Sequence, residues 1–243
     1  YFSIITVVKN DEVNIKNTIK SVTKQSFKNF EYIIIDGKSK DNTLKNIIDF
    51  KKKITKIVSK KDKGIYYAMN KGIKLSKGKV VVFVNSGDTL KLNALKTIHN
   101  IFEKNIHFEY VFGTVLRHYT KTSILKYGVN IKKLYFNFDF ATSHSTGFFL
   151  KRKNFEKYGL FNTNYKCSSD YDLYYRLIIK NKIIGGSTKR SQLIGEVQKG
   201  GYSSKISFTD HVIEEAKIRL DNDQNKLVIL AIILNSFFKK IFF

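Results

Sequence analysis

The sequence predicts an α/β protein with a mostly parallel central sheet flanked by helices, followed by further helices at the C-terminal end. In the first half of the chain, strand-like and helix-like segments alternate and are separated by short polar turns. The strand-like segments are continuously apolar, as expected for strands that are covered on both faces of a sheet. Successive strands joined by helices form right-handed βαβ units, and such units require parallel strands.

The individual elements are predicted from hydrophobic spacing and from the turn residues between segments. Predicted strands of the first half span residues 3–8, 31–36, 54–59 and 79–85. Predicted helices of the first half span residues 11–25, 41–50, 65–75 and 92–104. In the second half we expect strands at residues 110–118, 123–127, 146–151, 183–184 and 193–197, and helices at residues 168–180, 208–220 and 226–238.

Composition limits the class of protein. A chain of 243 residues with 42% hydrophobic residues is long enough for one well-packed domain or two fused lobes. The formal net charge of +24 favours polyanionic partners, namely nucleic acid, anionic lipid or phosphate-rich substrates. The single cysteine, Cys167, excludes an intrachain disulfide and fits a reducing cytoplasm.

The C-terminal segment is the most apolar part of the chain. No window reaches the roughly 18 apolar residues that a membrane-spanning helix needs. Residues 227–234 are wholly apolar, and phenylalanines and lysines follow them. Such a helix lies in a bilayer interface, packs on the domain, or forms a dimer. With no secretory signal recognised, we expect a cytoplasmic protein, with peripheral contact at the inner face of the plasma membrane as one alternative.

Two acidic residues follow predicted strands and therefore point toward one edge of the sheet. In parallel α/β sheets, ligands bind in the crevice outside the carboxyl ends of the strands. Asp36 ends one strand, and its carboxylate is placed to accept from a base N–H or a ribose hydroxyl, while Ser39, Asp41 and Thr43 brace the following loop. The alternative is an ordinary loop between a strand and a helix.

Asp88 closes the turn that follows the most hydrophobic strand. Its carboxylate is placed to hold Mg²⁺ or Mn²⁺ bridging diphosphate oxygens, because these hard cations prefer oxygen ligands and retain several waters. The alternative is a Gly-Asp turn before a helix.

The predicted helix at residues 168–180 begins with acidic residues. Acidic side chains at a helix start are commonly capping residues. The alternative is that Asp170 is a general base for an acceptor hydroxyl, while Asp172 faces elsewhere and pairs with Arg176 one turn later. His144 is a candidate for the acceptor side, although a lone histidine is more often structural.

Six segments occur in an order typical of one enzyme family. They read SIITVVKND, YIIIDGKSKDNT, SKKDKGIYYAMNKGIKLSKGKVVVFVNSGD, HSTGFFLKR, SSDYDLYYRL and KGGYSS. From Ser3 to about Ser204 the chain resembles the family 2 glycosyltransferases with the GT-A fold, particularly bacterial enzymes of O-antigen, capsule and exopolysaccharide assembly. The resemblance implies one catalytic domain over residues 1–204, with a nucleotide-sugar half (1–105) and an acceptor half (106–204), and a helical extension over residues 205–243.

The resemblance also implies roles for individual residues. Asp88 resembles the metal-binding carboxylate, Asp170 resembles the base, and the acceptor is expected near His144. The implied nucleotide-binding residues are Thr6, Val7, Asp36, Asp41, Asp62, Lys63, Gly64, Ala68 and Asn70. The implied reaction is inverting transfer from a nucleotide-diphospho-sugar, with UDP favoured, to a glycan or polyprenyl-linked saccharide in surface polysaccharide synthesis.

Two departures from the family pattern leave alternatives open. Asn85 stands where many relatives have a first acidic metal ligand, and Ser169 stands where many have glutamate. The Ser-Gly-Asp form resembles a known branch of the family, so the departures bear on metal affinity, with Asp88 as the one protein carboxylate on the metal, and do not imply inactivation. A catalytically inactive nucleotide-sugar-binding relative is a separate alternative. A basic nucleic-acid-binding protein is another, but the sequence has no helix-turn-helix, zinc-finger or RNA-recognition signature, and we expect no nucleic-acid partner. Oligomerisation stays open.

Overall fold

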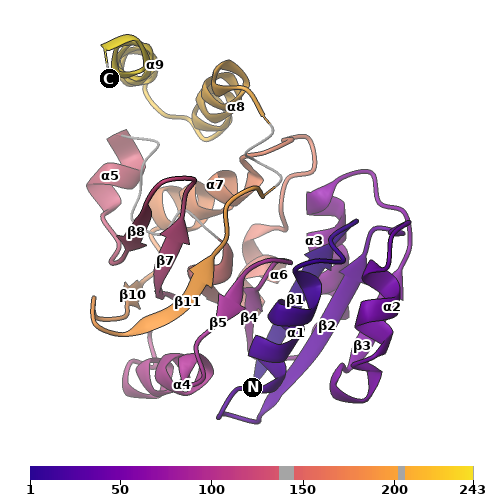
Figure 1. Ribbon diagram of the computed structural model, residues 1–243. Helices are drawn as coiled ribbons and strands as arrows, with labels where there is room; N and C mark the ends of the chain where they lie inside the picture. The colour runs from indigo at the N-terminus through magenta and orange to yellow at the C-terminus, as the bar shows by residue number, and fades with distance from the viewer. Residues whose placement is uncertain (137–144, 202–205, 243) are drawn as a thin grey trace.

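The computed structural model describes residues 1–136, 145–201 and 206–242 of the chain and shows two sheets surrounded by helices (Figure 1). Within these residues the larger sheet has seven strands, in the spatial order β10 (Gly185–Ser187), β6 (Tyr110–Phe112), β9 (Phe148–Lys151), β4 (Val80–Phe83), β1 (Phe2–Val8), β2 (Phe30–Asp36) and β3 (Lys56–Ser59). The smaller sheet has four, in the order β5 (Thr89–Leu90), β11 (Leu193–Val197), β7 (Thr114–His118) and β8 (Ser123–Lys126).

The helices include all those predicted from the sequence, together with two short ones, at residues 131–136 and 153–158, that were not predicted. The α-helices are α1 (Ile15–Thr23), α2 (Thr43–Ile48), α3 (Ile65–Leu75), α4 (Ala94–Lys104), α5 (Ile131–Phe136), α6 (Lys153–Tyr158), α7 (Ser169–Tyr174), α8 (Phe208–Asp221) and α9 (Lys226–Phe242). Two short 3₁₀ helices, η1 (Lys51–Lys53) and η2 (Ser145–Gly147), and a π-helix that continues α7, η3 (Tyr175–Lys180), complete the set.

The mostly parallel sheet is confirmed. Strands β3, β2, β1 and β4 pair in parallel, and β10 is parallel to β6. Only β9 runs against its neighbours β4 and β6 within the described part of this sheet. The carboxyl ends of β1, β2 and β4 therefore meet at one edge, and the segment after β9 lies at the opposite edge.

The continuous apolar strands are explained by two cores, one on each face of the sheet. In β1, Ile4 belongs to the core beneath α1 and α4, and the next residue, Ile5, belongs to the core beneath α3. Both side chains are fully buried. Because successive strand residues point to opposite faces, a strand covered on both sides needs apolar residues at every position.

The strands differ from the predictions in three places. The strand predicted at residues 110–118 divides at Gly113 into β6 and β7, which belong to different sheets. A Cβ at Gly113 would lie 2.8 Å from Cγ1 of Ile194, so the chain crosses β11 closely at this division. The strand predicted at residues 183–184 lies instead at β10, and the two-residue strand β5 was missed because it is too short for a period to appear.

The C-terminal helices predicted from sequence are present, and α8 packs on α7. Asn222 Nδ2 donates to Asp172 Oδ1 at 3.2 Å, and the guanidinium of the fully buried Arg219 lies 5.2 Å from the ring centroid of Tyr171. The domain boundary at residue 204 stays a prediction. Within the described residues, none of the helices has the length and apolarity needed to cross a bilayer.

We predict that Gly72→Ala destabilises the protein. A Cβ on Gly72 of α3 would lie 2.5 Å from Cγ2 of Ile5, so α3 or β1 has to shift. Overpacking of this kind costs about 1–3 kcal/mol, whereas alanine favours an open helix position by roughly 1 kcal/mol. Denaturant unfolding measures the difference. Gly64→Ala, whose Cβ meets Tyr67 at an ordinary 3.7 Å, is the control, and a Gly72→Ala protein as stable as wild type would contradict this packing.

Candidate active site

Loops at the carboxyl ends of β1 and β2 are joined by hydrogen bonds. The backbone N–H of Asn10 donates to Ser39 Oγ at 2.8 Å, and Asn10 Oδ1 accepts from the N–H of Lys40 at 2.8 Å. Asp41 Oδ2 accepts from the N–H of Glu12 at 3.2 Å. These reciprocal bonds make the two loops one rim beside the ends of the strands.

Asp36 is buried at the centre of this rim. Its side chain is fully buried, and its two oxygens accept from the hydroxyls of Ser39 at 2.5 Å and Ser59 at 2.6 Å. The backbone N–H of Ser39 also donates to it. A buried carboxylate needs such donors, so Asp36 holds the loop after β2 and the end of β3 together. Its contact with a nucleotide base stays a prediction.

Asp41 braces the start of α2. Burial raises its pKa, but hydrogen bonds from the Thr43 side chain and backbone, with others, hold the pKa of Asp41 below its ordinary value. The Thr43 N–H donates to Oδ1 at 3.0 Å. The carboxylate is therefore charged at neutral pH, as a loop brace requires.

Asp88 lies at the end of the turn after β4, in the middle of three segments. Its Oδ2 accepts from the Thr146 hydroxyl at 2.6 Å, and its Oδ1 accepts from the N–H of Gln198 at 3.1 Å. Asn85, on the same turn, donates to Ser145 Oγ at 3.0 Å. Asp88 thus joins the turn to η2 and to the segment after β11.

The oxygens on this turn fit a divalent cation. In the described residues, the buried Asn85 Oδ1 has no hydrogen-bond partner, and it lies on the same turn as the Asp88 carboxylate. Both are oxygen donors of the kind that Mg²⁺ and Mn²⁺ prefer, and one or two protein oxygens suffice when a diphosphate supplies others. Within the described ranges, no group of three or more His, Cys, Asp or Glu side chains is placed to hold a metal ion.

Asp170 lies in the first turn of α7 and is partly exposed. Its Oδ1 accepts from the N–H of Tyr171 at 2.9 Å and from the phenol of Tyr66 at 3.4 Å. Burial, followed by the charge of Asp170, raises the pKa of Tyr66, so the phenol stays protonated and donates. The sequence did not single out Tyr66, which comes from α3, about a hundred residues away in the chain.

The segment before α7 is held in place from both sides. On one side, Asn70 of α3 donates to the carbonyl of Phe161 at 2.8 Å and accepts from its N–H at 3.0 Å. On the other, Arg176 donates to Asp172 Oδ2 at 2.9 Å and to the carbonyl of Leu160 at 2.7 Å. The expected pair of Asp172 and Arg176 is present. The Asn70 amide is engaged with the protein backbone, and its nucleotide contact stays a prediction.

Three of the other predicted nucleotide-binding residues are buried. Thr6 is fully buried, and its hydroxyl donates to the carbonyl of Val84 at 2.6 Å. Val7 and Ala68 belong to the core beneath α3. Their side chains support the site from within the protein.

Asp62, Lys63 and Gly64 lie in the loop before α3. Asp62 Oδ1 pairs with Lys71 at 2.6 Å, and its Oδ2 is buried and has no hydrogen-bond partner in the described part of the chain. Lys63 and Gly64 are exposed. His144 lies outside the described residues.

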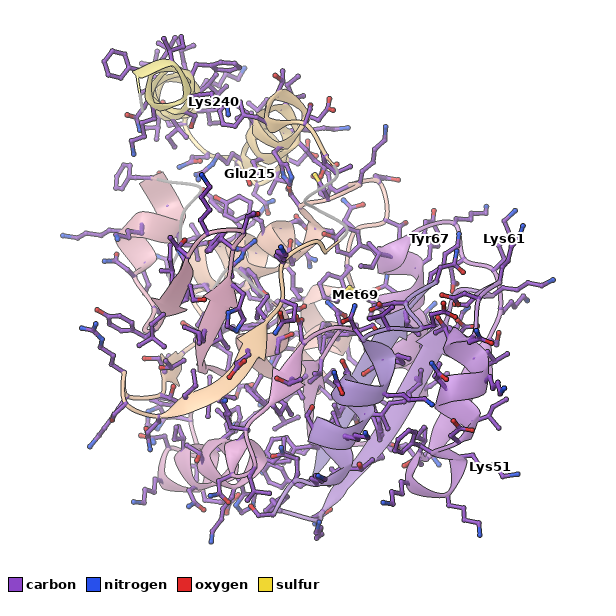
Figure 2. All side chains as sticks on the ribbon, viewed as in Figure 1. Lys51, Lys61, Tyr67, Met69, Glu215 and Lys240 are labelled. Carbon is purple, nitrogen blue, oxygen red and sulfur yellow. The ribbon has the colours of Figure 1, made fainter. Side chains whose placement is uncertain are left out.

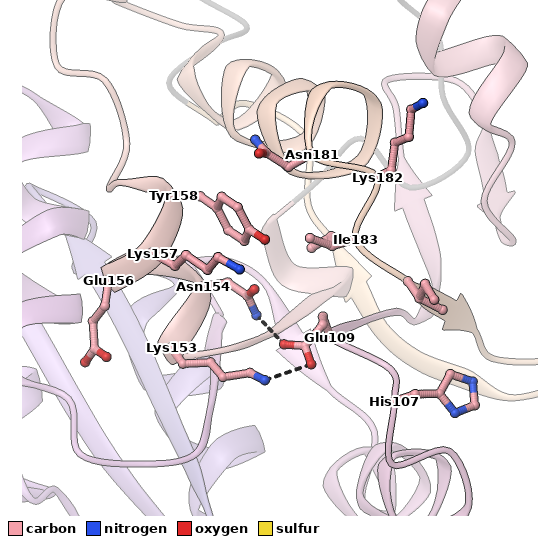
Figure 3. Close-up of a pocket in the computed structure, with 11 residues that line it drawn as sticks. His107, Glu109, Lys153, Asn154, Glu156, Lys157, Tyr158, Asn181, Lys182 and Ile183 are labelled. Carbon is pink, nitrogen blue, oxygen red and sulfur yellow. Dashed lines mark hydrogen bonds and ion pairs between the residues drawn. The ribbon is translucent and has the colours of Figure 1, made fainter.

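A separate hollow of about 690 Å³ lies at the opposite edge of the sheet (Figure 3). Its wall includes His107 and Glu109 before β6, and residues 153, 154 and 156–158 of α6. Glu109 is held there by Lys153 at 2.9 Å and by Asn154 at 2.9 Å. The hollow contains none of the predicted site residues, so it is distinct from the catalytic edge.

The fold and site together define a class of protein. A mostly parallel sheet places Asp36 at the carboxyl end of β2 and Asp88 after β4, on either side of β1, and Asp170 follows on a helix from the second half. This arrangement is that of a nucleotide-sugar-dependent glycosyltransferase of the GT-A fold. The family model for glycosyl transferase family 2 matches residues 3–168, and the chain belongs to this family.

Curated relatives include two bacterial glycosyltransferases. The UDP-Glc:alpha-D-GlcNAc-diphosphoundecaprenol beta-1,3-glucosyltransferase WfgD of Escherichia coli is 33% identical over 110 residues, which cover 44% of each chain. The PGL/p-HBAD biosynthesis glycosyltransferase of Mycobacterium bovis is 25% identical over 181 residues, covering 72% of this chain and 68% of the relative. The match thus spans less than half of the E. coli relative.

Solved structures with the same fold include two glycosyltransferases. S. aureus TarS 1–349 in complex with UDP-GlcNAc superposes with a TM-score of 0.76 at 19% identity, covering 98% of this chain and 72% of TarS 1–349. The mannosyltransferase PcManGT of Pyrobaculum calidifontis in complex with GDP-Man and Mn²⁺ has a TM-score of 0.64 at 15% identity, covering 95% of this chain and 68% of that structure. At these identities the likeness shows the fold alone.

A further acidic residue, Glu215, lies on the side of α8 that faces the rest of the domain (Figure 2). In the described residues its buried Oε2 has no hydrogen-bond partner. Burial raises the pKa of Glu215 to about 8; the charge of Arg219 opposes this shift, and the charges of Asp170 and Glu214 add to it.

We predict that Glu215→Gln changes how stability depends on pH. From the ordinary pKa of 4.5 to about 8, folded Glu215 holds a proton that the unfolded chain has released. Wild-type stability therefore falls as pH rises through this window. The Tm of Glu215→Gln minus the Tm of wild type should therefore increase by a few degrees between pH 4 and pH 9. Asp210→Asn, the same charge change on α8, is the control, and parallel profiles for Glu215→Gln and wild type would contradict the shifted pKa.

Proposed function

We propose that the protein is an inverting glycosyltransferase that transfers a sugar from a UDP-sugar to a saccharide carried on polyprenyl diphosphate. The observation that carries the proposal is the Asp170 carboxylate at the start of α7, which accepts from Tyr66 and from the N–H of Tyr171. Two of the similar proteins support the choice of substrates. The E. coli relative is named for UDP-Glc and a diphosphoundecaprenol acceptor, and TarS was solved with UDP-GlcNAc.

The donor binds at the joined rim of the β1, β2 and β4 loops. Asp36 contacts the base, and Asp88 with Asn85 would hold a divalent cation. When bound, the cation neutralises negative charge that develops on the leaving diphosphate. Lys63, exposed before α3, adds positive charge on the same side.

Asp170 acts on the acceptor. It takes the proton from an acceptor hydroxyl as that oxygen forms a bond to the anomeric carbon and the bond from this carbon to the diphosphate oxygen breaks. Direct displacement from the opposite face inverts the anomeric centre. The neutral phenol of Tyr66 stabilises the carboxylate before transfer and fixes its orientation.

We predict that Asp170→Asn lowers kcat by about 10²–10⁴-fold and leaves donor binding intact, because asparagine keeps the shape but cannot accept the proton. Thermal stability shifts with UDP-, GDP- and dTDP-sugars in the presence of Mn²⁺ measure donor binding, since a ligand of the folded state raises its stability. Transfer to a short-chain polyprenyl-diphosphate saccharide measures turnover.

Asp88→Ala is the complementary variant. It should lose the shift caused by the donor in Mn²⁺, as should wild type after chelation. Binding of a UDP-sugar without transfer by wild type would identify an inactive relative. Full activity of Asp170→Asn would contradict the assignment of Asp170 as the base. If none of the nucleotide sugars shifted the thermal stability of wild type, the proposed donor site would be contradicted.

The second part of the proposal is peripheral binding to an anionic bilayer through α9. One face of α9 already packs on α8. Ile229 and Ile232 are buried, and Phe237 contacts Phe208 of α8 at a centroid distance of 5.6 Å. Lys240 lies between the two helices, with its ammonium 5.7 Å from the Phe208 ring centroid (Figure 2).

The opposite face of α9 forms an exposed apolar stripe. Its large side chains recur at helical spacing and have exposed fractions of 53–77%: Leu227, Leu230, Leu234, Phe238 and Ile241. No acidic residue follows Asp223, whereas lysines occur at both ends of α9. Apolar side chains with flanking lysines match an interface of anionic headgroups above acyl chains. This placement brings the enzyme to a lipid-linked acceptor.

We predict that the protein floats with vesicles containing phosphatidylglycerol at physiological salt, and less with neutral phosphatidylcholine. Leu234→Glu should lower vesicle binding by about tenfold or more, because it puts a charge in the stripe. Asn235→Glu adds the same charge beside the stripe and should bind nearly as wild type. If wild type did not bind vesicles, the proposal that this face of α9 binds a bilayer would be wrong. It would also be wrong if sedimentation showed that wild type is a dimer and that Leu234→Glu is a monomer.

A further inference from the structure

We propose that Glu214 of α8 is a positioning residue that holds the start of α7 so that Asp170 faces the acceptor. The inference rests on the proposed role of Asp170 as base. It assigns part of the catalytic geometry to a helix that lies beyond residues 3–168, the segment matched by the family model.

The Glu214 carboxylate accepts hydrogen bonds from the backbone N–H groups immediately before α7. Its Oε1 accepts from the N–H of Lys166 at 2.5 Å. Its Oε2 accepts from the N–H groups of Cys167 at 2.7 Å and Ser168 at 2.8 Å. Three consecutive amides on one carboxylate fix the backbone of residues 166–168, and Asp170 follows two residues later.

The Cys167 thiol completes this clamp. Burial, and next its hydrogen bond to Glu214, raise the pKa of Cys167 to about 12, so the thiol is protonated and donates to Glu214 Oε2 at 2.9 Å. Burial opposes ionisation of Glu214, but bonds from the Cys167 side chain and the three amides hold the pKa of Glu214 below its ordinary value. The clamp is therefore anionic at neutral pH, when charge-assisted bonds are strongest.

The position of the clamp favours an effect on turnover. The residues before α7 lead directly into the turn whose Tyr171 N–H binds the Asp170 carboxylate. A rotation of this turn moves Asp170 relative to Tyr66 and to an attacking hydroxyl. Misplacement of a reacting group by about 1 Å costs as much as 100-fold in rate. The β1, β2 and β4 loops do not contact Glu214 through any hydrogen bond found in the described residues, so donor binding should be unaffected.

Glu214→Gln tests the proposal, because it keeps the side-chain shape but replaces one acceptor oxygen with an NH₂ group that faces an N–H donor. We expect kcat to fall roughly 10- to 100-fold while KM for the UDP-sugar stays unchanged. Amide hydrogen exchange of residues 166–168 should quicken by about tenfold or more, and exchange in β1 and β2 should not change.

Tyr165→Phe is the matched control for stability. It removes a bond between the same two segments, the donation from the Tyr165 hydroxyl to Asp221 Oδ2 at 2.6 Å, and leaves the three amides engaged. Below the Tm of both variants, Tyr165→Phe should retain kcat when Glu214→Gln does not. Equal losses in the two variants, or a Glu214→Gln kcat within about twofold of wild type, would overturn the proposal.

The two proposals fail in different ways. If wild type transfers no sugar from any donor, the proposed function fails, and hydrogen exchange alone decides whether the clamp exists. If wild type is active and Asp170→Asn is inactive, but Glu214→Gln keeps kcat, only the positioning role of Glu214 is wrong.

Discussion

Parallel pairing of β1 with β2 and β4 is the constraint on which the rest of the site depends. The register pairs Val8 with Asp36, so β1 and β2 end at the same level, and it pairs Ile5 with Phe83, so β4 ends three residues earlier at the same edge. The strands are largely apolar because both faces of the sheet are covered. The polar residues inside β1, Ser3 and Thr6, are fully buried and hydrogen-bonded, Ser3 to Glu31 and Thr6 to the carbonyl of Val84. The carboxylates of Asp36 and Asp88 instead stand at or after the ends of their strands, so the polar rim forms at this edge.

The fold of the first half was largely predictable, because its signals are local. Each strand is centred on a run of apolar residues, and each helix shows one apolar face. The second half was less predictable, since its strands change partners. Gly113 separates β6 from β7 where the chain passes close to Ile194, and these two residues are eighty-one positions apart in the sequence. No short window of sequence contains both residues, so the division was invisible to periodicity.

The same distinction explains which site residues were found. Asp36, Asp88 and Asp170 were identified because each stands at the end of a strand or the start of a helix. Their partners come from distant segments: Ser59 binds Asp36, Thr146 binds Asp88, and Tyr66 binds Asp170. A serine, threonine or tyrosine in a sequence gives no sign of which carboxylate it will reach. Sequence thus identifies the charged groups, and the fold supplies the donors that hold them.

The C-terminal helices connect this site with the surface proposed to meet the membrane. Glu214 of α8 holds the backbone before Asp170, and Asn222 at the end of α8 donates to Asp172. On its other side, α8 packs against α9 through Phe208 and Phe237. A bilayer that orders α9 would therefore act on α8, and through the Glu214 clamp on the base. Under this arrangement, membrane binding and alignment of Asp170 share one structural element, and the enzyme would be best aligned where its lipid-linked acceptor resides.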